Sequence, residues 1–215
     1  MDTTENTTPT IEYFYALASP WSYLGNALLL QLAQRHGVHV DPIIIDYDTM
    51  FEAAKTVPLP GRPPLRKAYR LVELARWSER RGVALNPEPK FYRGEVEEPN
   101  EYDAALLVTA AKLAGQDSLR LGNALSRALW AEERSPFGVE EMRDIATVEG
   151  FDYDDLASPS ARADAQSAYA TATQYAVSRK VFGMPFYIFQ DEPFWGQDRL
   201  ELLEDAIVRY RATAS

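Results

Sequence analysis

Two strand-like runs enclose a single helix near the start of the chain, and this arrangement constrains the fold more than any other feature of the sequence. Residues 11–17 are rich in Tyr, Phe and Ile, and residues 38–45 contain three consecutive Ile. Between them, residues 21–34 carry Leu at helical spacing, and Gly37 is suited to a helix C-cap. The short connections predict a right-handed βαβ unit with parallel strands, of which the second should be buried on both faces.

The middle of the chain shows helical periodicity without a convincing strand, and strand signals return near the C-terminus. Helices are expected over residues 64–81, 102–114, 119–133, 139–149 and 160–181. After them come an aromatic run at 186–189, a turn at 190–193, a returning strand that starts at Phe194-Trp195, and a closing helix over 198–211. The order is therefore βαβ, helices, then ββα.

This order predicts an α/β protein with a thioredoxin-like fold that carries a large all-helical insertion. The thioredoxin-like domain is expected to comprise residues 10–47 plus 180–215, and the helical insertion domain residues 48–179. Residues 1–9 are expected to form a disordered N-terminal tail.

The composition argues against several function classes. The 215 residues contain 22 Lys and Arg against 32 Asp and Glu, a formal net charge of -10, which disfavours nucleic acid or an anionic membrane as partner. No signal peptide or membrane span is recognisable, so a cytoplasmic location is expected. The chain has no Cys, which excludes dithiol chemistry and thiolate zinc sites, and His36 and His39 lack further ligands, so no metal site is expected. A small organic substrate is favoured, and both a monomer and a homodimer are compatible with the sequence.

Ser19-Pro20-Trp21-Ser22 lies where the first strand gives way to the helix, and its two hydroxyls have the spacing of the thiols in a redox C-x-x-C motif. A plain N-cap is one interpretation of Ser19, since a Ser side chain accepts from the backbone N–H two or three residues on. Pro20 fits the first helical turn because its missing N–H would have no intrahelical acceptor. A functional interpretation of Ser19 needs further residues close to it.

The loop at Met184-Pro185 precedes the third strand and, in the thioredoxin order, lies beside the N-terminus of the first helix. A cis Met184-Pro185 bond there would leave the Met184 N–H and C=O free to pair with an extended, peptide-like ligand. The alternative is that Pro185 has only a structural role, as a residue that separates the helix from the strand.

The segment Trp195-Gly196-Gln197-Asp198-Arg199 precedes the closing helix. Free backbone N–H groups at a helix N-terminus would bind a carboxylate while Asp198 paired with an ammonium, so the segment predicts a pocket for a zwitterion. A plain turn, with Asp198 stabilising the helix start, is the alternative, and both can hold at once.

In this order the three elements resemble the DsbA-like superfamily with a helical insertion, and specifically 2-hydroxychromene-2-carboxylate isomerases and kappa-class glutathione transferases. The matching stretches are SPWSYLGN at 19–26, RKVFGMPFYIF at 179–189 and FWGQDRLELLE at 194–204. The resemblance spans essentially the whole chain, because the intervening helices also fit the family's insertion. It implies glutathione as cofactor, a small aromatic or conjugated substrate and a part in aromatic catabolism.

The resemblance also implies roles for individual residues. The catalytic residue would be Ser19, next to the cysteine sulfur of glutathione. The residues implied at glutathione are Pro20, Trp21, Arg66, Lys67, Met184, Pro185, Gln197, Asp198 and Arg199. A helix N-terminus and hydrogen-bond donors lower the pKa of a thiol, and a Ser hydroxyl can donate such a bond without competing as a nucleophile. In the isomerases the thiolate would add to the conjugated substrate, open the chromene ring, permit rotation about a former double bond and leave.

Two assignments keep an ordinary alternative beside them. Tyr23 and Trp195 are placed at the substrate pocket, with core packing as the alternative. Families of this type carry an Asn and then a basic residue after the second strand; residues 53–70 offer no Asn, and Arg66 or Lys67 is assigned to a ligand carboxylate, with solvated helix charge as the alternative. Two other functions also stay open: a kappa-like transferase that releases a conjugate, and a cysteine-less DsbA-like binding protein without turnover.

Overall fold

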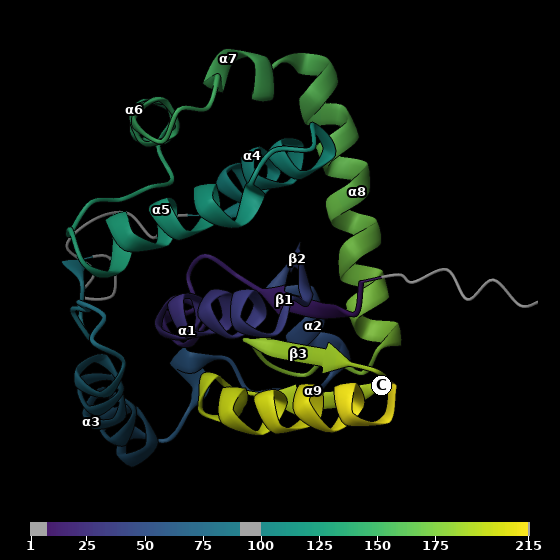
Figure 1. Cartoon of the computed structure of the whole chain (residues 1–215). Coiled ribbons are helices and arrows are strands. Elements are labelled where there is room, and N and C mark those ends of the chain that lie inside the picture. The colour runs from purple at the N-terminus through teal and green to yellow at the C-terminus, as the bar shows by residue number, and fades with distance from the viewer. Residues whose placement is uncertain (1–7, 91–99, 215) are drawn as a thin grey trace, which may run out of the picture.

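A four-stranded mixed sheet forms the centre of one half of the molecule (Figure 1). The computed structural model describes residues 8–90 and 100–214. The strands are β1 (Thr10–Tyr15), β2 (His39–Ile44), β3 (Phe186–Phe189) and β4 (Glu192–Trp195), in the spatial order β2-β1-β3-β4. β1 runs parallel to β2 and antiparallel to β3, and β3 pairs antiparallel with β4. The predicted thioredoxin-like order is therefore confirmed.

Helices form most of the remaining chain. In chain order they are α1 (Pro20–His36), α2 (Tyr47–Ala53), the 3-10 turn η1 (Leu59–Gly61), α3 (Pro64–Arg81), α4 (Tyr102–Leu113), α5 (Ser118–Trp130), α6 (Val139–Val148), α7 (Tyr153–Leu156), α8 (Pro159–Ser178), the 3-10 turn η3 (Gln197–Arg199) and α9 (Leu200–Ala214). The five helices predicted in the middle of the chain correspond to α3, α4, α5, α6 and α8, with small shifts at their ends. The sequence did not predict α2 and α7, which are too short to show a clear period.

Successive side chains of β1 face two different layers of helices, because side chains alternate along a strand. Tyr13 and Tyr15 belong to a large core that includes residues of α1 and α9 and continues into α4 and α5. Phe14 belongs to a smaller core with Met50 of α2 and Ala176 of α8. The sheet is thus covered on both faces, and its large core crosses the boundary drawn at residues 47 and 48.

The expectation that the second strand is buried on both faces was wrong. His39 is exposed, and the residues that follow it are only partly buried as far as Pro42. Among the described strands, β2 lies at the edge of the sheet beside β1, and its first half is left partly exposed. The run of Ile at its end is what packs, with Ile43 and Ile44 both buried.

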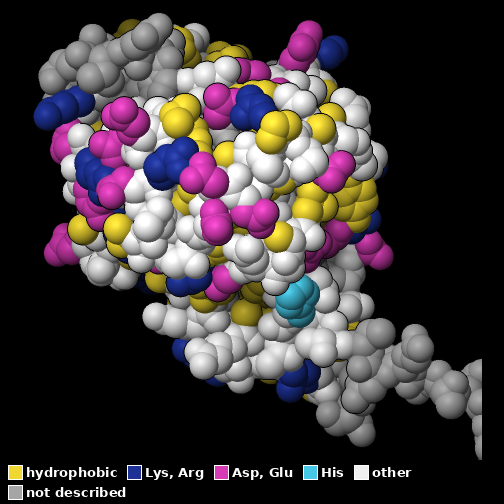
Figure 2. Space-filling view, turned by 90° about the horizontal axis from the view of Figure 1, so that it is seen from above, with side chains coloured by type: hydrophobic (Ala, Val, Ile, Leu, Met, Phe, Trp, Pro, Cys, Tyr) yellow, Lys and Arg dark blue, Asp and Glu magenta, His cyan; other side chains and the backbone are white. Residues whose placement is uncertain are grey.

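The described surface carries intermingled charges. On the face shown in Figure 2, Lys and Arg side chains lie among Asp and Glu side chains rather than in one continuous basic area. Within residues 8–90 and 100–214, none of the helices has the length and apolar character needed to cross a bilayer.

Candidate functional site

Ser19 ends the extended segment after β1 and caps α1. Its backbone is extended, its Oγ accepts a hydrogen bond from the Ser22 N–H at 3.3 Å, and Pro20 follows in the first helical turn. Ser19 and Trp21 are half-buried, so both remain accessible from solvent. Because Pro20 has no N–H and the Ser22 N–H is taken, the Trp21 N–H is the first donor of the helix without an intrahelical acceptor. The N-cap interpretation is therefore confirmed.

The loop before β3 lies against Ser19, as the thioredoxin order predicts. Phe14 of β1 pairs with Phe186 of β3, which brings the end of one strand and the start of the other to the same edge of the sheet. There the Ser19 hydroxyl donates to the Met184 carbonyl at 3.4 Å, and the Met184–Pro185 peptide bond is cis. Ser19 and the Met184–Pro185 loop, far apart in the sequence, thus meet at one site, which is called the corner below.

The segment that follows β3 joins this corner through Trp195. The Gly196 N–H donates to the Pro185 carbonyl at 2.9 Å, which ties the end of β4 to the loop before β3. Trp195 is 54% exposed, and its ring packs edge-on against Phe182, with ring centroids 4.9 Å apart. A Cβ on Gly183 would lie 2.5 Å from the Trp195 Nε1, so this position has to be Gly for the ring to lie where it does. Phe182 was not predicted, because it falls between the helix expected over residues 160–181 and the loop at Met184-Pro185.

Gln197 is held by the protein itself. It is 2% exposed, and Arg81 at the end of α3 donates from Nε to its Oε1 at 2.8 Å and from Nη2 to its backbone carbonyl at 2.8 Å. Arg81 also pairs with Glu201 at 2.8 Å. Arg81 thus occupies the side-chain oxygen and the backbone carbonyl of Gln197, which leaves its amide NH2 and its backbone N–H as donors for the predicted contact with a ligand.

Asp198 and Arg199 lie at the surface of the same turn and pair with each other at 2.5 Å. Such a partly exposed pair contributes little to stability and can open to admit a ligand. An ammonium bound by Asp198 would compete with Arg199 for the carboxylate.

The remaining predicted residues lie toward α3. Arg66 and Lys67 are exposed in its first turns, and the Lys67 Nζ donates to the Pro60 carbonyl at 3.3 Å. The Tyr23 hydroxyl donates to the Ala84 carbonyl at 3.1 Å, and burial raises the pKa of this phenol. The side-chain hydrogen bonds of Lys67 and Tyr23 thus run to the segments before and after α3, although the Tyr23 backbone N–H donates to the Ser19 carbonyl at 3.1 Å.

Gly25, in the stretch SPWSYLGN, allows α1 to approach the turn at η3. A Cβ on this residue would lie 2.9 Å from the Gln197 Cβ, closer than real Cβ atoms pack, and 3.0 Å from the Tyr187 hydroxyl, which is also unusually tight. The absence of a side chain therefore brings the first helix and the Gln197 segment together at one end of the sheet.

Glu101 is a buried carboxyl group beside the corner that sequence reasoning missed. It directly precedes α4, is 6% exposed, and its Oε2 accepts from the Ala18 N–H at 2.7 Å. Burial raises its pKa to about 8, and Asp46 and Asp48 act in the same direction, against the hydrogen bond from Ala18. An acidic residue at a helix start is ordinarily solvated and stabilises the helix dipole, so the burial of Glu101 could not be predicted from its position in the sequence.

Residues 10–208 match the family model of the DSBA-like thioredoxin domain. The chain belongs to this DsbA-like family. The 2-hydroxychromene-2-carboxylate isomerase of Pseudomonas sp. (strain C18) is 29% identical to it over 202 residues, which cover 92% of this chain and 89% of the relative. The enzyme of the same name from Sphingobium xenophagum is 29% identical over 203 residues, 94% of this chain and 99% of the relative.

A solved structure of a 2-hydroxychromene-2-carboxylate isomerase matches with a TM-score of 0.75 at 27% identity, over 96% of this chain and 99% of that one. The resemblance predicted from the three sequence stretches is therefore confirmed, and the relatives indicate an enzyme of the isomerase class.

This DsbA-like chain contains no Cys, so its site has no thiol of its own. What the corner offers is a hydroxyl donor on Ser19, the N-terminus of α1 and the backbone of Met184. Hydrogen-bond donors at a helix N-terminus suit an anion, including a thiolate that a ligand supplies.

Proposed function

We propose that this DsbA-like chain is a glutathione-dependent isomerase of the 2-hydroxychromene-2-carboxylate type, in which Ser19 stabilises the glutathione thiolate. The observation that carries the proposal is the half-buried Ser19 hydroxyl at the N-terminus of α1, in contact with the loop before β3. Similarity to isomerases of that name over 92% and 94% of the chain supports the substrate class.

The residues of the corner fit a thiolate. Because Ser19 Oγ accepts from the Ser22 N–H, its own proton is available to another acceptor. That proton points to the Met184 carbonyl at 3.4 Å, a long distance for an O–H···O hydrogen bond. A thiolate that took the place of the carbonyl as acceptor would gain a charge-assisted bond, and the positive end of α1 would favour it further.

When bound, glutathione would supply a thiolate nucleophile that adds to a conjugated substrate and leaves it again unchanged. Ser19 would hold the charge of the sulfur, and the Met184 N–H and C=O would orient the peptide backbone. The exposed Trp195 ring and its neighbour Phe182 would present apolar surface to the aromatic substrate.

Charged groups at the border of the corner would bind the ends of both ligands. Arg66 or Lys67 would meet a carboxylate of the substrate or of the glycine end, while Gln197, Asp198 and Arg199 would meet the γ-glutamyl end. Since the basic residues are exposed, their contribution is expected to be modest and sensitive to salt.

Calorimetry with glutathione tests the binding step, with S-methylglutathione as a control that keeps the peptide and removes the ionisable thiol. We expect glutathione to bind more tightly and to release a proton as its thiol ionises. A failure of the wild-type chain to bind glutathione would contradict the proposal. The ultraviolet spectrum of a chromene carboxylate then separates isomerisation, which leaves glutathione unchanged, from transfer, which consumes it.

A further inference from the structure

The Glu101 carboxyl group is buried, and only one of its two oxygens has a hydrogen-bond partner among the described residues. Its Oε2 holds the Ala18 N–H at 2.7 Å, directly before Ser19 in the chain. Its Oε1 is buried and has no hydrogen-bond partner among the described residues. A buried group that leaves half of its hydrogen-bonding capacity unused is costly, so its position calls for an explanation.

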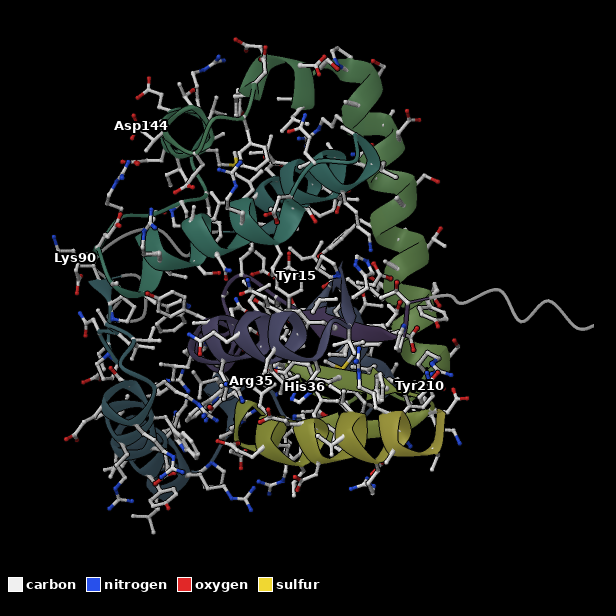
Figure 3. All side chains as sticks on the ribbon, in the orientation of Figure 1. Tyr15, Arg35, His36, Lys90, Asp144 and Tyr210 are labelled. Carbon is white, nitrogen blue, oxygen red and sulfur yellow. The ribbon has the colours of Figure 1, made fainter. Side chains whose placement is uncertain are left out.

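The titratable groups around Glu101 are acidic, and among the described residues only the backbone of Ala18 and Leu17 acts to lower its pKa. Asp46 and Asp48 act on it from the start of α2, and it acts in turn on the phenols of Tyr15 from β1 and Tyr169 from α8. Figure 3 shows Tyr15 between α1 and the helices α4 and α5. A carboxylate among acidic and phenolic groups, out of water, is disfavoured relative to a neutral carboxylic acid.

We propose that Glu101 is a positioning residue for the corner. Its carboxyl group fixes the Ala18 amide, and hence the position of Ser19, while the proton on this carboxyl group keeps a second negative charge away from a thiolate bound at Ser19. The first half stands on the structure alone, and the second half rests on the proposed function. A neutral carboxyl oxygen still accepts from the Ala18 N–H, so the loop is held without the charge. An ionised Glu101 would instead repel an anionic sulfur bound at Ser19.

The test compares wild type with Glu101→Gln, which keeps an acceptor for the Ala18 N–H but cannot ionise, and Glu101→Ala, which removes the acceptor. Asp103→Asn, which changes an acidic residue in the first turn of α4 that pairs with Arg162, is the matched control. Hydrogen exchange at the Ala18 amide should rise about tenfold in Glu101→Ala and stay near the wild-type rate in Glu101→Gln. This measurement needs no ligand.

The pH profile of glutathione binding supplies a measurement that a merely structural role would not change. Between pH 7 and 9, the affinity of the wild type should fall about tenfold relative to Glu101→Gln, with no such difference for S-methylglutathione. Parallel glutathione profiles, or unchanged Ala18 exchange in Glu101→Ala, would overturn the inference. If the wild type binds no glutathione, the proposed function fails, while the exchange rates still decide whether Glu101 holds the corner.

Discussion

Replacing Ser19 with Ala separates the capping role of its hydroxyl from its role toward sulfur. The two hydrogen bonds of this hydroxyl are long, 3.3 Å from the Ser22 N–H and 3.4 Å to the Met184 carbonyl. The loss of the cap should therefore cost no more than about 1 kcal/mol of unfolding free energy, or roughly 2–4 °C in Tm for a chain of this size.

The effect on glutathione should be much larger. A hydrogen bond to a charged group contributes about 1.5–3 kcal/mol, so Ser19→Ala should weaken glutathione binding by about 10- to 150-fold. Calorimetry gives the affinity, and thermal unfolding of the same samples gives the stability. Ser19→Gly, which retains most of the cap stability, should lose as much affinity as Ser19→Ala.

Ser22→Ala is the matched control, because it makes the same change one turn along α1 at a buried hydroxyl. It should leave the affinity for glutathione within about twofold of wild type, since the Ser22 hydroxyl is buried and interacts with the Tyr13 phenol. Equal affinities of wild type and Ser19→Ala for glutathione would refute the assignment of Ser19 to the thiolate.

Three further perturbations test the surrounding structure. Arg81→Ala should cost about 2–3 kcal/mol in urea unfolding, because its side chain is 9% exposed and ties α3 to η3 by charged hydrogen bonds; a loss below about 0.5 kcal/mol would contradict this. Gly183→Ala should displace the Trp195 ring, change its fluorescence and cost about 1–3 kcal/mol, whereas Gly138→Ala, which has open space at its Cβ, should leave the spectrum unchanged. Because the pKa of Glu101 is raised from 4.5 to about 8, the stability linked to its bound proton is fully present below pH 4.5 and is lost as the pH rises through 8. The unfolding free energy of the wild type should therefore fall by at most about 5 kcal/mol more than that of Glu101→Gln over this pH range. Parallel profiles of unfolding free energy against pH would rule this out.

Local signals in the sequence predicted the elements that begin and end with strong punctuation. The helix over residues 64–81 was predicted with both ends as found, because Pro64 suits a first helical turn and Gly82 adopts the left-handed conformation that ends it. The burial of the second strand was predicted wrongly, since hydrophobicity alone does not show whether a strand lies at the edge or the centre of a sheet.

Some contacts of the candidate site could likewise be predicted from the sequence and others could not. Ser19 and Met184 could be paired from the sequence, because the thioredoxin order fixes which loops meet at the edge of the sheet. The contact of Glu101 with Ala18 could not be predicted, because the burial of Glu101 depends on how α4 packs against the segment before α1. The hydrogen bond from Arg81 to Gln197 could not be predicted either, because it joins two helical segments from different parts of the chain.

The most direct measurement is the initial rate at which the wild-type chain isomerises 2-hydroxychromene-2-carboxylate, followed by ultraviolet absorbance with glutathione added or omitted. We predict a rate that requires glutathione, saturates with it and leaves its total concentration unchanged after many turnovers. An equal rate without any thiol, or the loss of one glutathione for each substrate converted, would contradict a glutathione-dependent isomerase.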